Sequence, residues 1–207
     1  MKNTNNDRLL IFDLDGVIFN SKKNMQSAWT ETSKKFNLRI SFSSYFKKIG
    51  MPFSKILTSL GVQPFDKIFE YYNKKSLEAF SLVKPYKHVL KELKYLEKNK
   101  IKFSIVTSKN LKRTKFFLKK FNIKPCSIHC PNKKLRGKPY PDHLLKSLER
   151  NKVKAQNAYY FGDTDVDFLA AKRAKINFVF VKYGYGKYKN AYKINITNFK
   201  EIKNFIL

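Results

Sequence analysis

Short apolar runs alternate with amphipathic helical patterns along most of this chain. The runs are rich in aromatic and β-branched residues, a composition typical of buried strands, and they cover residues 8–13, 101–106, 158–161 and 176–181. Apolar residues at helical spacing lie between and after them, over residues 86–98, 110–121, 141–150 and 165–175. This alternation predicts an α/β fold with a doubly wound, mostly parallel sheet.

The alternation is interrupted between residues 20 and 84. This stretch contains no convincing strand pattern but several helical ones, over residues 24–37, 42–49, 53–60 and 65–80. We therefore expect an all-helical insertion at 20–83 within a core formed by 1–19 and 84–207. Because the insertion directly follows the first strand, it is expected over the carboxyl ends of the strands, where open α/β folds bind ligands. There it can act as a lid.

The composition is strongly basic, with 44 Lys+Arg against 15 Asp+Glu and a net charge of +29. An apolar content of 43% supplies a packed core and excludes a disordered chain. Only six of the basic residues are Arg, and the lysines are spread along the whole chain. Nucleic-acid binders are expected to use more Arg, whose planar group contacts phosphates and bases. We therefore expect no specific nucleic-acid partner, although a basic nucleic-acid-binding protein without turnover stays an alternative.

Targeting signals and cysteines add two further expectations. Residues 1–16 lack the apolar stretch of a signal peptide, and no apolar run approaches membrane-spanning length, so we expect a cytoplasmic protein without a membrane partner. Cys126 and Cys130 are too few for a disulfide scaffold. With His129 they offer three ligands, whereas a structural zinc site uses four, so buried or idle thiols on a short strand are expected.

The scarce acidic residues gather in two short windows. Five of the fifteen are Asp13, Asp15, Asp163, Asp165 and Asp167. Asp13 and Asp15 end the first predicted strand, where residues two apart face the same way. Carboxylates this close repel each other unless a cation lies between them or one is protonated. Asp13 together with Asp163 offers the hard oxygen ligands that suit Mg²⁺, whereas Asp165 is explained as an acid in a first helical turn.

Polar side chains also follow two other predicted strands. The Thr107 hydroxyl and the nearby backbone N–H groups are candidate ligands for a phosphoryl oxygen. The alternative is an N-cap for the helix at 110–121, which Ser108 or Asn110 would serve equally well. Lys138 precedes Pro139 in the loop after the third strand, which is the short strand expected at the two cysteines, and this position makes it a further candidate.

Four segments carry a family resemblance: DLDGVI at 13–18, VTSKN at 106–110, GKPYPDHLL at 137–145, and the stretch from Tyr159 to Gly186. With these segments in this order, the chain resembles the haloacid dehalogenase (HAD) superfamily over about residues 8–187. It is similar to the subclass with a helical cap after the first motif, and within it to the phosphoglycolate-phosphatase-like branch. The resemblance implies a Mg²⁺-dependent phosphoric monoester hydrolase acting on a small phosphorylated metabolite.

The resemblance also implies residue roles. Asp13 would be the nucleophile that becomes an aspartyl phosphate, and Asp15 the acid and base for the leaving alcohol and the attacking water. Mg²⁺ would be held by Asp13, Asp163 and the backbone carbonyl of Asp15. Asp167 would orient a metal-bound water or Lys138.

The phosphoryl oxygens would be bound by Thr107, Ser108 and Lys138. The implied substrates range from phosphoglycolate to sugar phosphates and nucleotides, and the cap selects among them. Lys47, Lys48 and Lys55 of the cap offer positive charge to a substrate carboxylate or second phosphate, but most of them are expected to be solvated.

Other activities stay as alternatives. The second acid, Asp15, argues against the dehalogenase branch. A β-phosphoglucomutase-like phosphomutase is disfavoured because Phe53 lies near the place of the mutase arginine and Gly162 precedes Asp163 where mutases tend to carry Glu. A phospho-accepting signalling protein without turnover is a further alternative. Either a monomer or a homodimer is compatible with the sequence.

Overall fold

A parallel six-stranded sheet forms the centre of the computed structural model, which describes residues 8–63, 66–132 and 134–206. The strands in spatial order are β5 (Ser127–His129), β4 (Phe103–Val106), β1 (Leu9–Phe12), β6 (Ala158–Gly162), β7 (Asn177–Val181) and β8 (Ile194–Ile196). Every neighbouring pair runs parallel. The predicted doubly wound α/β fold is therefore confirmed.

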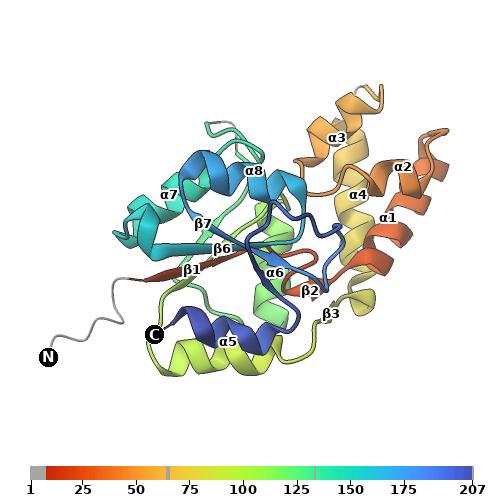
Figure 1. Cartoon of the computed structure of the whole chain (residues 1–207). Helices are drawn as coiled ribbons and strands as arrows, with labels where there is room; N and C mark the ends of the chain where they lie inside the picture. Colours follow the sequence, from red (N-terminus) through yellow and green to blue (C-terminus); the bar gives the residue numbers. More distant parts are fainter. Residues whose placement is uncertain (1–7, 64–65, 133, 207) are drawn as a thin grey trace, which may run out of the picture.

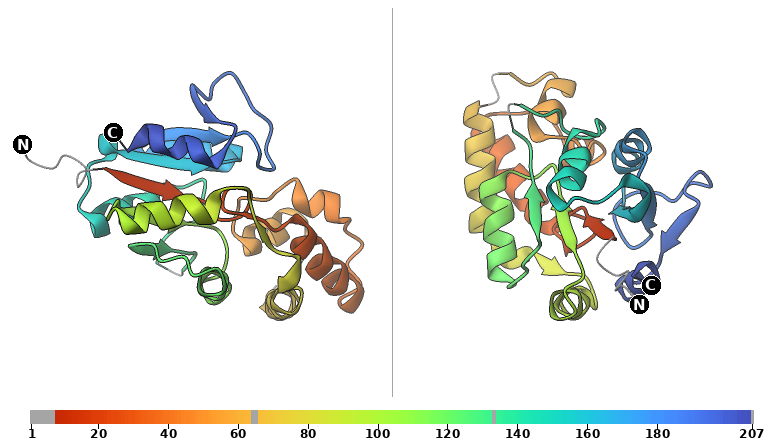
Figure 2. Two further views of the ribbon diagram at one scale, coloured as in Figure 1. Left: turned by 90° about the horizontal axis from the view of Figure 1, so that it is seen from below. Right: turned by 90° about the vertical axis from the view of Figure 1, so that its left-hand side faces the viewer.

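Helices cover both faces of this sheet (Figure 2). The β1 residues Leu10 and Phe12 pack with α5 (Val89–Lys98), α6 (Leu111–Lys120) and the 3₁₀ helix η4 (Phe199–Phe205). Leu9 and Ile11 point to the other face, where they pack with α7 (Asp142–Asn151) and α8 (Asp165–Ala174). Burial on both faces explains why β1 is a continuous apolar run and not an alternating one.

A helical insertion, defined here as α1 to α4, extends from one end of the sheet (Figure 1). Its helices are α1 (Lys22–Lys35), α2 (Phe42–Phe46), α3 (Phe53–Ser59) and α4 (Asp66–Glu78). They enclose a buried cluster of their own, in which the Trp29 ring stacks on Tyr45 at 4.4 Å between centroids. The chain enters and leaves the insertion through a two-stranded antiparallel sheet of β2 (Phe19–Asn20) and β3 (Lys84–Pro85), with the 3₁₀ helix η2 (Phe80–Leu82) before β3.

Some elements differ from the sequence-based predictions. The short β2–β3 pair, β8 and η4 were not predicted, nor was the short 3₁₀ helix η3 (Ala155–Asn157). The helix predicted at 86–98 begins only at Val89, because His88 before it has a φ of +70°, in the left-handed region. The helix predicted at 42–49 ends at Phe46.

Three smaller expectations can also be compared with the fold. Residues 1–7, where the signal peptide was considered, and Phe65, the predicted start of a helix, lie outside the described residues. Both cysteines are free and flank β5, but only Cys130 is buried, whereas Cys126 is exposed. Among the described helices, none has the length and apolar character needed to cross a bilayer.

We expect Trp29→Ala to lower the free energy of unfolding by about 3–5 kcal/mol, because it leaves a large cavity in the insertion. Trp29 is 1% exposed, and its indole N–H donates to the Ile40 carbonyl at 3.0 Å. Leu145, which is 46% exposed on α7, provides the control. Leu145→Ala should change stability by no more than about 0.5 kcal/mol. Urea denaturation of the two variants measures the difference, and equal effects would contradict a packed insertion core.

Candidate active site

The site lies where the order of the strands reverses. From β1 the chain proceeds outward through β4 and β5, and it then returns to β6 on the other side of β1. Phe12 of β1 is in register with Phe161 of β6, and the Asp13 N–H donates to the Phe161 carbonyl at 2.9 Å. Asp13 and Asp163 follow these strands and therefore meet at the carboxyl edge of the sheet, the usual ligand-binding position in open α/β folds.

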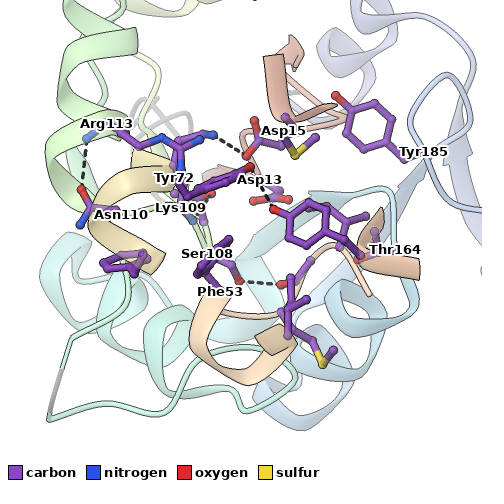
Figure 3. A pocket seen from close by; sticks show the side chains of 18 residues that line it. Asp13, Asp15, Phe53, Tyr72, Ser108, Lys109, Asn110, Arg113, Thr164 and Tyr185 are labelled. Atoms are coloured by element: carbon purple, nitrogen blue, oxygen red, sulfur yellow. Dashed lines mark hydrogen bonds and ion pairs between the residues drawn. The ribbon is translucent and has the colours of Figure 1, made fainter. Parts of the chain in front are cut away.

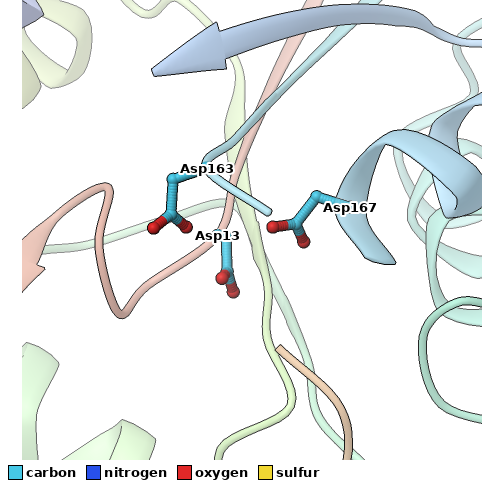
Figure 4. A group of neighbouring side chains, drawn as sticks. All are labelled: Asp13, Asp163 and Asp167. Atoms are coloured by element: carbon cyan, nitrogen blue, oxygen red, sulfur yellow. The ribbon is translucent and has the colours of Figure 1, made fainter. Parts of the chain in front are cut away.

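Three buried carboxylates converge at this edge (Figure 4). Oxygens of Asp13, Asp163 and Asp167 lie within 4.8 Å of one another, and the three residues are 4%, 0% and 0% exposed. Asp163 Oδ2 accepts a hydrogen bond from the Tyr185 backbone N–H at 2.6 Å. Asp163 Oδ1 is buried and has no hydrogen-bond partner among the described residues. Asp13 and Asp163 were expected here from the sequence, whereas Asp167 was expected to orient a metal-bound water or Lys138.

Asp167 is held by the start of its own helix. Its Oδ2 accepts from the Thr164 N–H at 3.1 Å and from the Thr164 hydroxyl at 2.5 Å. The Thr164 side chain in turn accepts from the Asp167 backbone N–H, so the two residues form a capping box at the start of α8. The other oxygen, Oδ1, is thereby directed toward Lys138.

Lys138 is the one ammonium that contacts this carboxylate group in the described part of the chain. Its Nζ lies 3.0 Å from Asp13 Oδ1 and 2.7 Å from Asp167 Oδ1. It also donates to the Tyr160 hydroxyl at 3.1 Å, and that hydroxyl donates to Asp167 at 2.7 Å. Burial by itself would lower the pKa of Lys138, but Asp13 and Asp167 outweigh it and raise the pKa above its ordinary value.

The group keeps an excess of negative charge, with three carboxylates against one ammonium. Burial, followed by the charges of Asp167 and Asp13, raises the pKa of Asp163 well above its ordinary value. Burial also raises the pKa of Asp13, against the opposing effect of Lys138. A divalent cation with oxygen ligands would relieve this repulsion and would give the orphaned Asp163 Oδ1 a partner. The residues therefore fit a metal ion.

Asp15 points to a different set of partners. Its Oδ2 forms an ion pair with Lys109 Nζ at 2.9 Å, and its Oδ1 accepts from the Ser21 hydroxyl at 2.5 Å. Burial by itself would raise the pKa of Asp15, but Lys109 and Ser21 outweigh it and hold the pKa below its ordinary value. Burial, with the charge of Arg113, lowers the pKa of Lys109 to about 8.

A small cavity of about 50 Å³ lies between the sheet edge and the helical insertion (Figure 3). By volume it has room for about three or four water molecules. The core lines it with mostly polar residues: Asp13, Asp15, Thr107, Ser108, Lys109, Asn110, Arg113, Thr164 and Tyr185. The insertion contributes a mostly apolar wall: Met25, Tyr45, Ile49, Gly50, Met51, Phe53, Ile56, Phe69 and Tyr72.

Thr107 and Ser108 both lie at this cavity, in the loop between β4 and α6. Asn110 is the N-cap of α6, because its side chain accepts from the Arg113 N–H. The alternative role of Thr107 and Ser108 as the cap is thereby excluded. The Ser108 hydroxyl is engaged with the insertion, since it donates to the Gly50 carbonyl at 2.5 Å.

Several residues of the site were not predicted from the sequence. Lys109, Arg113, Ser21 and Tyr160 contact or surround the predicted acids. Lys109 had one available signal, because it lies two residues after Thr107 in the VTSKN segment. Arg113 and Tyr160 are ordinary residues of a helix and a strand, and Ser21, six residues after Asp15, is an ordinary residue just before α1.

Comparisons with known proteins agree with this architecture. A sequence profile for haloacid dehalogenase-like hydrolases matches residues 10–181. The phosphoglycolate phosphatase of Aquifex aeolicus is 29% identical over 185 residues, which cover 87% of this chain and 87% of the relative. The pyrophosphatase PpaX of Halalkalibacterium halodurans is 25% identical over 178 residues, covering 84% and 83%. A haloacid dehalogenase-like hydrolase from Streptococcus pneumoniae has the same fold, with a TM-score of 0.81 over 98% of this chain and 99% of that chain at 17% identity.

The loop after Asp15 supplies a test of this geometry. Gly16 has a φ of +88°, and a Cβ there would collide with the Asp163 carboxylate, whereas Gly61 has a φ of +73° with nothing within 4 Å. Gly61→Ala should therefore cost only the backbone strain, about 1–2 kcal/mol. Gly16→Ala should cost about 3 kcal/mol or more, because overpacking adds to the same strain. Chemical denaturation measures both variants, and equal losses would contradict the close approach of Gly16 to Asp163.

Proposed function

The chain belongs to the haloacid dehalogenase-like hydrolases, and we propose that it is a Mg²⁺-dependent phosphatase that hydrolyses small phosphorylated compounds through an aspartyl phosphate on Asp13. The observation that carries the proposal is the contact of Lys138 with both Asp13 and Asp167, beside an orphaned oxygen of Asp163. A carboxylate next to an ammonium and a cation site can accept an anionic phosphoryl group that it would otherwise repel.

Mg²⁺ would be held by the carboxylates of Asp13 and Asp163 and by the backbone carbonyl of Asp15. When bound, it supplies positive charge that offsets the repulsion between the nucleophile and the phosphate oxygens. Asp167 acts through Lys138. Its Oδ1 lies 2.7 Å from Lys138 Nζ and so keeps this ammonium beside Asp13. Lys138 and the Thr107 hydroxyl bind phosphoryl oxygens.

The chemistry has two steps. In the first, a carboxylate oxygen of Asp13 attacks phosphorus, the bond to the leaving oxygen breaks, and Asp15 donates a proton to that oxygen. In the second, Asp15 takes a proton from a water molecule, whose oxygen attacks phosphorus and releases phosphate from Asp13. The Lys109 and Ser21 contacts keep Asp15 ionised, as the second step requires. For the first step, the contact with Lys109 must loosen so that Asp15 can carry a proton.

The small size of the cavity favours a small substrate. Its volume of about 50 Å³ is bounded on one side by the insertion. The Ser108–Gly50 hydrogen bond joins the insertion to the core loop that carries Thr107. Opening this contact would admit the substrate and free the Ser108 hydroxyl for a phosphoryl oxygen. Closing it would exclude water other than the attacking molecule.

Pyrophosphate is a second candidate substrate. Relatives at 21% and 25% identity, with coverage similar to that of the phosphoglycolate phosphatase, are named pyrophosphatases, and the same two steps cleave a phosphoanhydride. A phosphomutase is less well supported, since the insertion lines the cavity with the apolar Phe53 near the place where mutases carry an arginine.

Metal binding can be tested without an activity assay. In EDTA, Asp163→Asn should raise the melting temperature above that of the wild type, because the neutral amide relieves repulsion among buried carboxylates. Mg²⁺ should stabilise the wild type, by about 2.7 kcal/mol at a concentration a hundred times the Kd, and should leave Asp163→Asn unchanged. Asp165→Asn is the matched control, because Asp165 is exposed and paired with Lys189. It should respond to Mg²⁺ like the wild type, and a Mg²⁺ shift retained by Asp163→Asn would contradict the assignment.

Phosphatase activity is tested by phosphate release from an aryl phosphate. The wild type should turn the substrate over with Mg²⁺ and lose activity in EDTA. Asp13→Asn should lower kcat at least about a thousandfold, because it removes the nucleophile, while Asp165→Asn keeps full activity. A panel of phosphoglycolate, pyrophosphate, hexose phosphates and nucleoside monophosphates then identifies the substrate. Full activity of a folded Asp13→Asn would refute the mechanism.

A further inference from the structure

Arg113 is a buried cation with no acidic partner in the part of the chain that the structure describes. It belongs to the first turn of α6 and is 5% exposed. Its Nη1 donates to the Asn73 side-chain oxygen at 3.1 Å, and its guanidinium lies over the Tyr72 ring, 5.2 Å from the centroid. Both partners are neutral, and Nε is buried without any hydrogen-bond partner among the described residues. Buried arginines are rare unless an anion pairs with them.

The nearest part of the site does not supply that anion. Arg113 and Lys109 are the two cations that line the cavity, and Asp15 is already engaged by Lys109 and Ser21. Asp13, the other acid of the lining, is paired with Lys138. The Arg113 end of the cavity therefore has an excess of positive charge, whereas the carboxylate group at the sheet edge has an excess of negative charge.

The insertion offers no second cation to this cavity. The cap lysines considered for a substrate anion, Lys47, Lys48 and Lys55, are absent from its lining, and Lys47 and Lys55 are exposed. Tyr45 and Tyr72 do line it, but their hydroxyls hydrogen-bond to each other at 3.0 Å. Among the described residues, Arg113 is thus the cavity-lining group with charge and N–H donors left for a ligand.

We propose that Arg113 binds a second anionic group of the substrate, so that the enzyme prefers phosphorylated compounds that carry a carboxylate or another phosphate close to the scissile phosphorus. This inference rests on the proposed phosphatase function. The planar guanidinium fork matches either anion in a bidentate contact. Asn73 and Tyr72 of α4 hold the fork in place. The small cavity keeps the second anion only a few atoms from the phosphoryl group.

The experiment compares substrates that differ only in the second anion. Phosphoglycolate and 2-hydroxyethyl phosphate share their size and their phosphate, but only the first carries a carboxylate. 1,2-Ethanediol bisphosphate and 2-hydroxyethyl phosphate form a second pair, in which the second anion is a phosphate and the leaving group is an alkoxide in both. We expect the wild type to have a higher kcat/KM for the anionic member of at least one pair, and the pair that shows it identifies the anion.

Arg113→Met should lower this preference about 30-fold, the lower range for a buried charged contact, mainly by raising KM for the anionic substrate. Arg113→Lys keeps the charge but loses the planar fork, so its substrate preference should lie between those of the wild type and Arg113→Met. Lys112→Met is the matched control, because Lys112 is the exposed neighbour on α6 and its loss changes the net charge equally. Its substrate preference should equal that of the wild type.

The outcomes separate the inference from the function on which it rests. If the wild type hydrolyses an aryl phosphate with Mg²⁺ but prefers neither anionic substrate, the inference is wrong and the phosphatase function stands. If Arg113→Met lowers kcat/KM equally for both members of a pair, Arg113 only joins α6 to α4, and the inference is again overturned. If the wild type hydrolyses no phosphate compound, the proposed function itself fails.

Discussion

The contact between Lys138 and two buried aspartates is the interaction on which the site depends. Taking three carboxylates out of water at the edge of a sheet carries a large desolvation cost, and their mutual repulsion adds to it. Lys138 offsets part of this cost from 3.0 Å and 2.7 Å, and Tyr160 fixes its position from within β6. The remaining excess of negative charge suits this edge to a bound cation, which a salt bridge of purely structural use would not need.

The strand order explains why these groups meet at all. Asp13 and Asp163 are 150 positions apart in sequence, yet they follow neighbouring strands in register. The core therefore supplies the charged wall of the cavity, and the insertion supplies a mostly apolar wall. An apolar wall lowers the local dielectric, which strengthens every charge interaction inside the cavity. The core and the insertion therefore differ in the charge that they bring to the cavity as well as in the part of its surface that they form.

The fold was predictable because parallel strands buried on both faces are continuous apolar runs, as β1 is. The carboxylate group was predictable because acids at strand ends converge once the strands are parallel. Arg113 was not, because one basic residue among 44 carries no local signal, and Lys109 offered only its place in the VTSKN segment. Their importance lies in burial and pairing, which arise from contacts such as Arg113 with Asn73 between distant helices. The short strands β2, β3 and β8 likewise depend on their partners more than on their own two or three residues.

The net charge of +29 and the buried charges act at different ranges. Exposed lysines raise the local concentration of anions, but salt screens them over about 8 Å at physiological ionic strength. Such a field attracts all phosphorylated compounds alike and therefore provides no selectivity. Lys138 and Arg113 are 3% and 5% exposed, so salt screens their charges far less. Under the proposed function, Lys138 meets the phosphoryl group that all candidate substrates share, so discrimination among them would come from Arg113, while the basic surface affects only how often substrates arrive.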